Sequence, residues 1–290
     1  MMETSLPWNI SKSRNASATA VNVFRLFWAF TLAFLAASPA FAQTISLRQH
    51  LDVSQPAAMS IDRMDNIYLT DRKNNVHQFN ATGRLVNTYS PPRTGNIANI
   101  EAWNAMKVML FYDDQQQITL LDRFLNNIAN IRLRDVTNNA LIKVATTAAN
   151  EQLWLFNESD FSLLKFDPRT SEIINTTELN LTFDRKKTDI RYIREYQNMV
   201  YLVDKTTGVY VFDNLGNYKK TLPFPELSYI GFKGDEMYFL KGGQLRFFNL
   251  YSFAERAYDV PPLQNYKQAL VGQELVYLLS ESGLDLYEFE

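Results

Sequence analysis

The chain has 290 residues, and its 31 acidic and 29 basic residues leave a net charge of −2. This balance excludes the strongly positive surface on which nucleic-acid binding depends, so we expect no nucleic-acid partner. The chain has no cysteine, which excludes disulfides, thiolate nucleophiles, zinc–thiolate sites and iron–sulfur clusters. Hydrophobic residues make up 46% and aromatic residues 13% of the sequence, which provides a substantial core and suits half-buried β-strands.

The segment 1–42 has the pattern of an export signal. Basic residues precede an apolar stretch over 24–37, and Ala40 and Ala42 mark a cleavage site. We expect cleavage after Ala42, with one domain over 43–290. An uncleaved membrane anchor is the alternative, but the apolar stretch is shorter than the ~20 residues that a spanning helix needs. Later apolar runs are short and broken by charges, so we expect an exported protein without a stable transmembrane segment.

A four-strand pattern recurs six times at intervals of about 40 residues, which is typical of β-propeller blades. In each copy an aromatic-rich run such as 153–156 leads to a second apolar run, which ends like Phe166 followed by Asp167. The aligned second-strand positions are Tyr68, Leu110, Trp154, Tyr201, Tyr238 and Tyr277. The aligned second-strand positions and the ends of the second apolar runs advance along the chain by nearly the same intervals. A β-sandwich, the alternative all-β fold, does not require this agreement. The sequence therefore predicts an all-β, six-bladed β-propeller.

The sixth copy reaches Glu290 without a fourth strand. The segment 44–53 has a strand pattern and belongs to no hairpin of the first copy. We expect it to pair with the third strand of the sixth copy and to close the ring, because closure leaves no sheet edge exposed. In the second copy the last turn lacks the glycine of the first and fourth copies and has Phe124, Leu125, Asn126 and Asn127 instead.

The blade pattern over 64–70, with Asn80, Thr82 and Gly83 in the next turn, resembles NHL-like and YWTD-like six-bladed propellers. Residues 99–126 and 153–157 look more closely like a family of exported propeller proteins from bacteria of the Bacteroidota. The resemblance implies a propeller fold and an envelope location. It transfers no catalytic residue to this chain.

Residue types that carry catalysis or bind metals are scarce. The two histidines, His50 and His77, lie in predicted strands without metal-ligand spacing, so we expect surface roles, no metal site and no cofactor. Paired acids occur at predicted turns, where Asp side chains accept backbone N–H groups. These pairs are Asp62 and Asp65, Asp113 and Asp114, and Asp184 and Asp189. Asp62 and Glu101 are the acids nearest the inner strands, so a catalytic site would use them. We expect Trp154 in the core and Trp103 near an inner hairpin.

Two loops between blades carry exposed basic residues. One contains Arg185, Lys186 and Lys187, and we expect Arg191 and Arg194 to extend this cluster. The other, over 90–96, contains Arg93. Both loops join a fourth strand to the next first strand, so they lie on the same face of a propeller. They are the candidate partner-facing loops, with an ordinary solvated loop as the alternative.

Three functions fit these observations. The favoured one is a non-catalytic binding or scaffold protein of the bacterial envelope, a monomer whose partner is an envelope protein or a glycan. The second is a hydrolase or lyase that acts on a sugar or a lactone in the central channel. The third is a small-ligand sensor or carrier. The fold by itself does not separate them, because function depends on the site.

Overall fold

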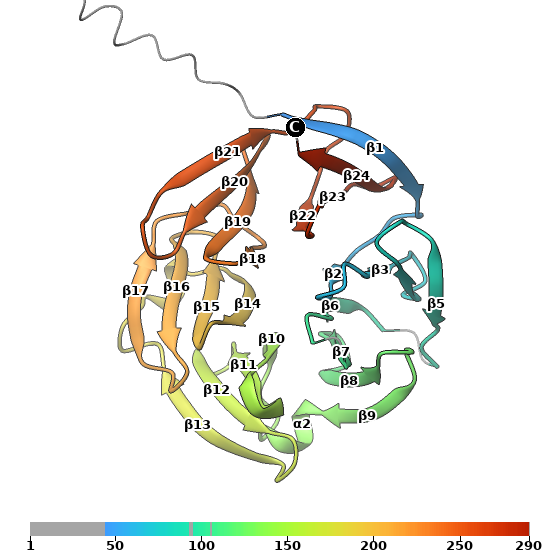
Figure 1. Cartoon of the computed structure of the whole chain (residues 1–290). Helices are drawn as coiled ribbons and strands as arrows, with labels where there is room; N and C mark the ends of the chain where they lie inside the picture. Colours follow the sequence, from blue (N-terminus) through green and yellow to red (C-terminus); the bar gives the residue numbers. More distant parts are fainter. Residues whose placement is uncertain (1–43, 93–94, 105, 290) are drawn as a thin grey trace, which may run out of the picture. The chain divides into compact units, whose positions relative to one another are not determined.

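Antiparallel sheets of four strands succeed one another around a central channel in the computed structural model of this chain (Figure 1). The structure describes residues 44–92, 95–104 and 106–289, and these form six such sheets, the blades. The first strand of each blade lies next to the channel and the fourth lies outermost (Figure 1). The predicted six-bladed propeller is confirmed. The expected export signal and its cleavage site lie outside the described residues.

The strands follow one another along the chain as the repeats predict. Blade 1 consists of β2 (Met59–Ile61), β3 (Ile67–Thr70), β4 (Val76–Phe79) and β5 (Leu85–Tyr89). Blade 2 consists of β6 (Ile97–Glu101), β7 (Lys107–Tyr112), β8 (Gln117–Asp122) and β9 (Asn127–Arg132). Blade 3 consists of β10 (Ile142–Thr147), β11 (Leu153–Asn157), β12 (Ser162–Asp167) and β13 (Glu172–Glu178).

Blades 4 to 6 complete the ring. Blade 4 consists of β14 (Ile190–Tyr196), β15 (Met199–Asp204), β16 (Gly208–Asp213) and β17 (Tyr218–Leu222). Blade 5 consists of β18 (Gly231–Lys233), β19 (Glu236–Lys241), β20 (Gln244–Asn249) and β21 (Glu255–Asp259). Blade 6 consists of β22 (Gln268–Val271), β23 (Leu275–Leu279), β24 (Gly283–Phe289) and β1 (Ile45–Asp52).

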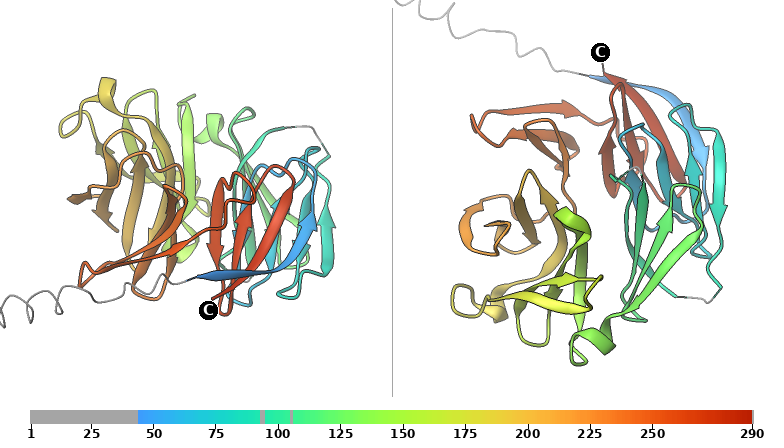
Figure 2. Two further views of the ribbon diagram at one scale, coloured as in Figure 1. Left: turned by 90° about the horizontal axis from the view of Figure 1, so that it is seen from above. Right: turned by 60° about the horizontal axis from the view of Figure 1, so that its bottom comes forward.

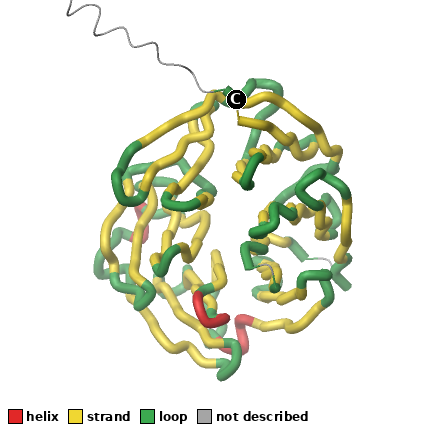
Figure 3. Tube along the Cα trace, viewed as in Figure 1, coloured by secondary structure: helices red, strands yellow, loops and turns green. Residues whose placement is uncertain are grey.

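Within the described residues, helix is confined to short segments between strands, as Figure 3 shows. These segments are α2 (Leu133–Val136), η1 (Ala149–Glu151) and η2 (Arg185–Lys187). Among the described residues, no helix is both long enough and apolar enough to span a membrane.

The burial of each strand follows its place in the blade. All five residues of β11 are buried, because a second strand has neighbouring blades against both of its faces. The outer strand β13 alternates between exposed and partly buried residues instead. Trp154 of β11 is fully buried, as expected, in a cluster that includes Leu202 and Phe212 of blade 4. Such clusters hold adjacent blades together, since each fully buried large apolar side chain contributes about 1.5–3 kcal/mol.

The hairpin turns repeat one arrangement of hydrogen bonds. Asp213 Oδ1 accepts from the N–H groups of Leu215 at 3.0 Å and Asn217 at 2.9 Å, and Gly216 has a φ of 83°. In the second blade Leu125 takes the position of this glycine with a φ of 65°. Its side chain is 4% exposed. Burial of the leucine in the core thus offsets a backbone conformation that favours glycine.

The ring closes through β1, which we call the latch. It pairs antiparallel with β24, from Ile45 opposite Phe289 to Asp52 opposite Gly283. Figure 2 shows the two strands side by side although they come from opposite ends of the described chain. Arg48 Nη1 adds a 2.9 Å ion pair to Glu288 on the exposed side. The predicted closure of the last blade by the N-terminal strand is therefore confirmed.

A polar network lies within the latch. The side chain of His50 donates to Asp285, which is directly opposite in the strand pair and 2% exposed. Asp285 also accepts from the hydroxyl of Tyr266 at 2.5 Å. The hydrogen bond to Asp285 raises the pKa of His50 above its ordinary value and outweighs the opposing effect of burial. The second histidine, His77, lies in β4 and contacts Asp71 and Thr88.

This network makes the stability of the latch depend on pH. A histidine whose pKa rises on folding adds stability that is fully present below its unfolded pKa of about 6.5 and is lost as the pH rises through the folded pKa. We predict that His50→Gln lowers the free energy of unfolding more at about pH 5.5 than at about pH 8.5. Denaturant unfolding of both proteins at the two pH values measures this difference, with His77→Gln as the matched control. An equal loss at both pH values would contradict it.

Candidate functional site

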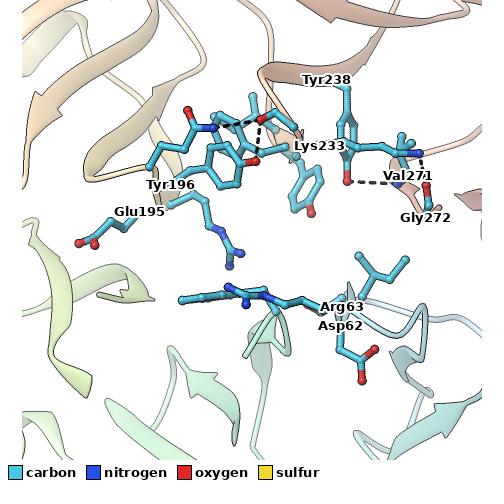
Figure 4. A pocket seen from close by; sticks show the side chains of 18 of the residues that line it. Asp62, Arg63, Glu195, Tyr196, Lys233, Tyr238, Val271 and Gly272 are labelled. Carbon is cyan, nitrogen blue, oxygen red and sulfur yellow. Dashed lines mark hydrogen bonds between the residues drawn. The ribbon is translucent and has the colours of Figure 1, made fainter. Parts of the chain in front are cut away.

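A cavity of about 640 Å³ lies at one end of the central channel, and all six blades contribute to its wall. Most lining residues lie where an innermost strand ends and turns to the second strand. In an antiparallel blade these turns share one end with the turns between third and fourth strands. We call this end the pocket face and the other end the opposite face. Figure 4 shows Arg63, Tyr196, Lys233 and Gly272, from four different blades, around the cavity.

A buried ion pair joins three blades at the wall of this cavity. Glu101, the last residue of β6, has a side chain that is 1% exposed and lies 2.8 Å from Nη1 of Arg194 in β14. Its carboxylate also accepts from Thr147 N at 2.6 Å, from Thr147 Oγ1 at 2.7 Å and from the hydroxyl of Thr146. Burial works to lower the pKa of Arg194, but the negative charge of Glu101 raises it overall. The pair therefore fixes Arg194 as a charged group in the wall.

Two guanidinium groups approach the ring of Trp103. Cζ of Arg194 lies 5.1 Å and Cζ of Arg63 5.7 Å from the ring centroid, within the range of cation–π attraction. The indole Nε1 donates to Thr147 Oγ1 at 2.8 Å, and the same hydroxyl donates to Glu101. The network around Glu101 thus orients the aromatic ring as well as the arginine.

The other carboxylates of the wall already accept hydrogen bonds from the protein. Glu195 Oε2 accepts from Trp154 Nε1 at 2.6 Å. Asp65 Oδ2 accepts from Gln273 N at 2.7 Å. Both carboxylates therefore accept at least one hydrogen bond from the protein, whereas N–H donors of the arginines in the wall remain available.

Asp62 takes part in the same turn arrangement as acids far from the cavity. Its Oδ1 accepts from Met64 N at 2.8 Å and from Asn66 N at 2.9 Å. Asp122 makes the corresponding bonds to residues two and four positions later, both at 2.8 Å. Tyr68 adds a hydroxyl bond to Asp62 Oδ2 at 3.2 Å. The geometry of Asp62 is that of a turn-capping side chain.

Aromatic side chains of blades 4 and 5 form a further part of the wall. Tyr196 and Phe232 stack with ring centroids 4.5 Å apart and planes 11° apart. The rings of Tyr192 and Tyr229 lie 4.7 Å apart. Burial raises the pKa of both Tyr192 and Tyr229 above the ordinary value. Both hydroxyls are therefore less acidic than that of a solvent-exposed tyrosine.

Lys233 joins blade 5 to blade 6 beside the cavity. Its Nζ donates to the carbonyl oxygens of Gly272 and Gln273, the latter at 3.1 Å. Burial lowers the pKa of this lysine, although the charge of Asp65 opposes the effect. Since Asp65 also binds the backbone of Gln273, these contacts connect blades 5, 6 and 1 around the mouth.

The structure separates the predicted partner-facing loops from this cavity. Arg185, Lys186 and Lys187 form η2, which precedes β14 on the opposite face, whereas β14 reaches the cavity at its other end. Arg185 donates to the carbonyl oxygens of Glu158 at 2.7 Å and of Ser159 at 3.0 Å. Arg93 lies outside the described residues.

The expected extension of the basic cluster to Arg194 is wrong. Arg194 lies in the inner strand β14 and pairs with Glu101 near the cavity. A strand advances about 3.3 Å per residue, so its far end cannot share one surface patch with η2. Arg191 pairs with Asp189 at 2.6 Å and is held near the start of the strand.

The two predicted catalytic candidates lie in the same region, but only one of them lines the cavity. Asp62 lines the cavity, and Glu101 lies behind Arg194 in the buried pair. Trp103, expected near an inner hairpin, follows β6 and lines the cavity. Sequence reasoning missed Arg63 and Lys233. The signal that marks them is their position at the end of an inner strand, which the repeat pattern had already located.

The remaining predicted acid pairs serve turns and surface contacts. Asp113 Oδ1 accepts from Asp114 N at 2.9 Å. Asp184 caps η2 through Lys186 N at 3.0 Å. In the part of the chain that the structure describes, no three His, Cys, Asp or Glu side chains gather in a way that could hold a metal ion.

Known proteins resemble this chain in fold but not in sequence. No family model matches the chain, and no curated protein matches its sequence. A streptogramin B lyase structure is 11% identical, with a TM-score of 0.60 over 87% of this chain and 100% of that one. A catalytically inactive virginiamycin B lyase from Staphylococcus aureus, with quinupristin, is 11% identical, with a TM-score of 0.59 over 85% and 99%. BamB from Moraxella catarrhalis is 9% identical, with a TM-score of 0.53 over 85% and 98%.

These neighbours are β-propellers, which agrees with the fold of this chain. They include a lyase and BamB, so neither the enzyme nor the scaffold hypothesis is decided by likeness. The finer resemblance to NHL-like and YWTD-like repeats and to exported Bacteroidota proteins stays a prediction.

A double-mutant cycle tests the ion pair between Glu101 and Arg194. Arg194→Gln leaves the buried carboxylate of Glu101 without its counter-charge, so we predict that it lowers the free energy of unfolding by about 3 kcal/mol. Glu101→Gln should cost less, because Arg194 faces the cavity. The double variant should lose clearly less than the sum, with an interaction energy of about 2 kcal/mol. Urea unfolding of the four proteins provides these values. Additive losses would show that the two side chains do not depend on each other.

Proposed function

We propose that this chain is a non-catalytic binding protein of the bacterial envelope, which holds a partner on its pocket face. The observation that carries the proposal is the imbalance within the cavity. Its carboxylates accept hydrogen bonds from the protein itself. The guanidinium group of Arg63 and the aromatic side chains near it line the cavity and are available to a ligand. A wall of this kind suits recognition, because binding needs positioned donors and apolar surface. General acid–base catalysis needs a carboxyl group within reach of a substrate.

Exposed apolar residues around the mouth support a macromolecular partner. Met64, Met106 and Tyr251 are 63%, 62% and 66% exposed. Met64 lies between Arg63 and Asp65, both of which line the cavity. The hydroxyl of Tyr251 donates at 2.9 Å to Gln197, another lining residue. Methionine and tyrosine are enriched at protein interfaces, and exposed apolar side chains that surround a pocket mark such surfaces.

The enzyme hypothesis stays the second candidate because the propeller neighbours include a lyase with quinupristin bound. Turnover of a sugar or lactone would need Asp62 or Glu101 at the reacting bond. Asp62 is held in its turn by Met64 and Asn66, and the side chain of Glu101 is 1% exposed. Both observations favour binding over catalysis. A small-ligand sensor or carrier would use the same cavity, whose volume of about 640 Å³ suits a compact ligand.

The envelope location rests on the sequence of the export signal. We propose that the chain is cleaved after Ala42 and that the propeller acts outside the cytoplasm as a monomer. The mass of the protein recovered from the envelope fraction checks this: a chain that begins at Gln43 supports export, and one that retains 1–42 in the cytoplasm opposes it.

Site-specific cross-linking in the native host tests which face binds a partner. A photoreactive residue at Met106 places the probe on the pocket face. The same residue at Lys186 places it on the opposite face, where the basic loops are the second candidate surface. We predict that the probe at Met106 gives one reproducible cross-linked protein. The additional substitution Arg63→Gln, at a residue that lines the cavity, should reduce the yield of this cross-link.

Two outcomes would contradict the proposal. A cross-link from Lys186 alone would move the partner to the basic loops. Conversion of a glycan or lactone panel by the purified protein, with loss of activity in Asp62→Asn, would establish an enzyme in its place.

A further inference from the structure

The cavity that we propose as the binding site also indicates the chemistry of its partner. Resting on that proposed function, we infer that the cavity receives a carboxylate of a partner protein, an acidic side chain or a chain terminus, on the guanidinium groups of Arg63 and Arg194. The ring of Trp103 lies beside both groups.

Unused hydrogen-bond donors carry this inference. A guanidinium group has five N–H donors in a planar fork, which matches the two oxygens of a carboxylate. Arg194 donates to Glu101 through Nη1 at 2.8 Å. Within the described residues, its other N–H groups have no hydrogen-bond acceptor. The guanidinium of Arg63 likewise has no acceptor and no ion pair within them, although it contacts the ring of Trp103.

The charge balance of the wall disfavours an anion that carries more than one negative charge. Lys233 is the third basic group that lines the cavity, and it already donates to two backbone carbonyl oxygens. Acidic residues outnumber the basic ones, because Asp62, Asp65 and Glu195 line the cavity and Glu101 lies behind Arg194. A phosphate would bring nearly two negative charges into this surrounding, whereas a carboxylate brings one.

The rim favours a protein as the source of that carboxylate. Met64 follows the lining residue Arg63, and Met106 lies in the turn between β6 and β7 on the pocket face; both present exposed, flexible apolar side chains. Methionine adapts its shape to apolar side chains of a partner. An acidic sugar would place hydroxyl groups against these methionines. An acidic residue flanked by apolar residues matches both the charged interior and the apolar rim.

Binding of short blocked peptides tests the inference directly. The probes are acetyl-Leu-Glu-Leu-amide and its matched control acetyl-Leu-Gln-Leu-amide, which differ only in the charge of the central side chain. Fluorine NMR of the full chain labelled with fluorotryptophan reports on the cavity, and the variant Trp103→Phe assigns the resonance. We expect the acidic peptide to shift the Trp103 resonance and to bind about tenfold or more tightly than the glutamine peptide.

Variants then locate the binding group. Arg63→Gln should weaken the acidic peptide by about tenfold or more, and it should still fold because Arg63 is exposed and unpaired among the described residues. Arg72→Gln removes an exposed arginine on the opposite face and should leave binding unchanged. Equal binding of the two peptides, or binding that Arg63→Gln does not weaken, would overturn the inference.

One further ligand separates the sources of the carboxylate. If methyl glucuronide shifts the Trp103 resonance at lower concentration than the acidic peptide, the carboxylate belongs to a glycan and the assignment to a protein is wrong. The two proposals also fail separately. A Met106 cross-link without peptide binding would overturn the proposal that the cavity binds a carboxylate, but would still support a partner on the pocket face. Arg63-dependent peptide binding would support the carboxylate even where no cross-link forms on either face.

Discussion

The strand pairing between β1 and β24 is the constraint on which the rest of the structure depends. The chain has no cysteine, so no disulfide helps to join its ends, and the ring is closed by backbone pairing together with the packing of the blades. Blade 6 holds its position beside blade 1 through this pairing and through seam contacts such as Gln268 Nε2 to Met59 O at 3.1 Å. Closure also covers the edge of β24, which would otherwise be open to other strands.

The cavity inherits its geometry from this closed ring. Its wall takes residues from every blade, so no single hairpin can build it. Two sets of contacts fix the wall: the Glu101–Arg194 pair with Thr147 ties blades 2, 3 and 4, and Lys233 with Asp65 ties blades 5, 6 and 1. Because the first set orients both an arginine and Trp103, the surface that we propose for binding is already arranged without a ligand. Such preorganisation lowers the cost of binding.

The fold was predictable from the sequence because each blade repeats the same pattern of apolar strands and polar turns. The buried second strands, the Asp and Asn turns and the closing strand within 44–53 lie where the pattern indicates. The site was less predictable, because it is made by residues that are distant in sequence. Glu101 and Arg194 come from different blades and meet only across the channel. Arg194 lies only seven residues after Lys187, so closeness in sequence suggested one basic cluster, whereas the structure places η2 before the start of β14 and Arg194 near the far end of that strand.

Thermal unfolding of two shortened chains tests the central claim most directly. One chain begins at Gln43 and keeps the latch, and the other begins at Ser54 and lacks it. The second chain leaves the edge of β24 exposed and lacks Ile45 and Val53, which belong to two apolar core clusters. We predict that the midpoint of unfolding of the second chain falls by about 10 °C or more, since each kcal/mol corresponds to about 2–4 °C in a domain of this size. Equal midpoints for the two chains would contradict the claim that this strand closes and stabilises the ring.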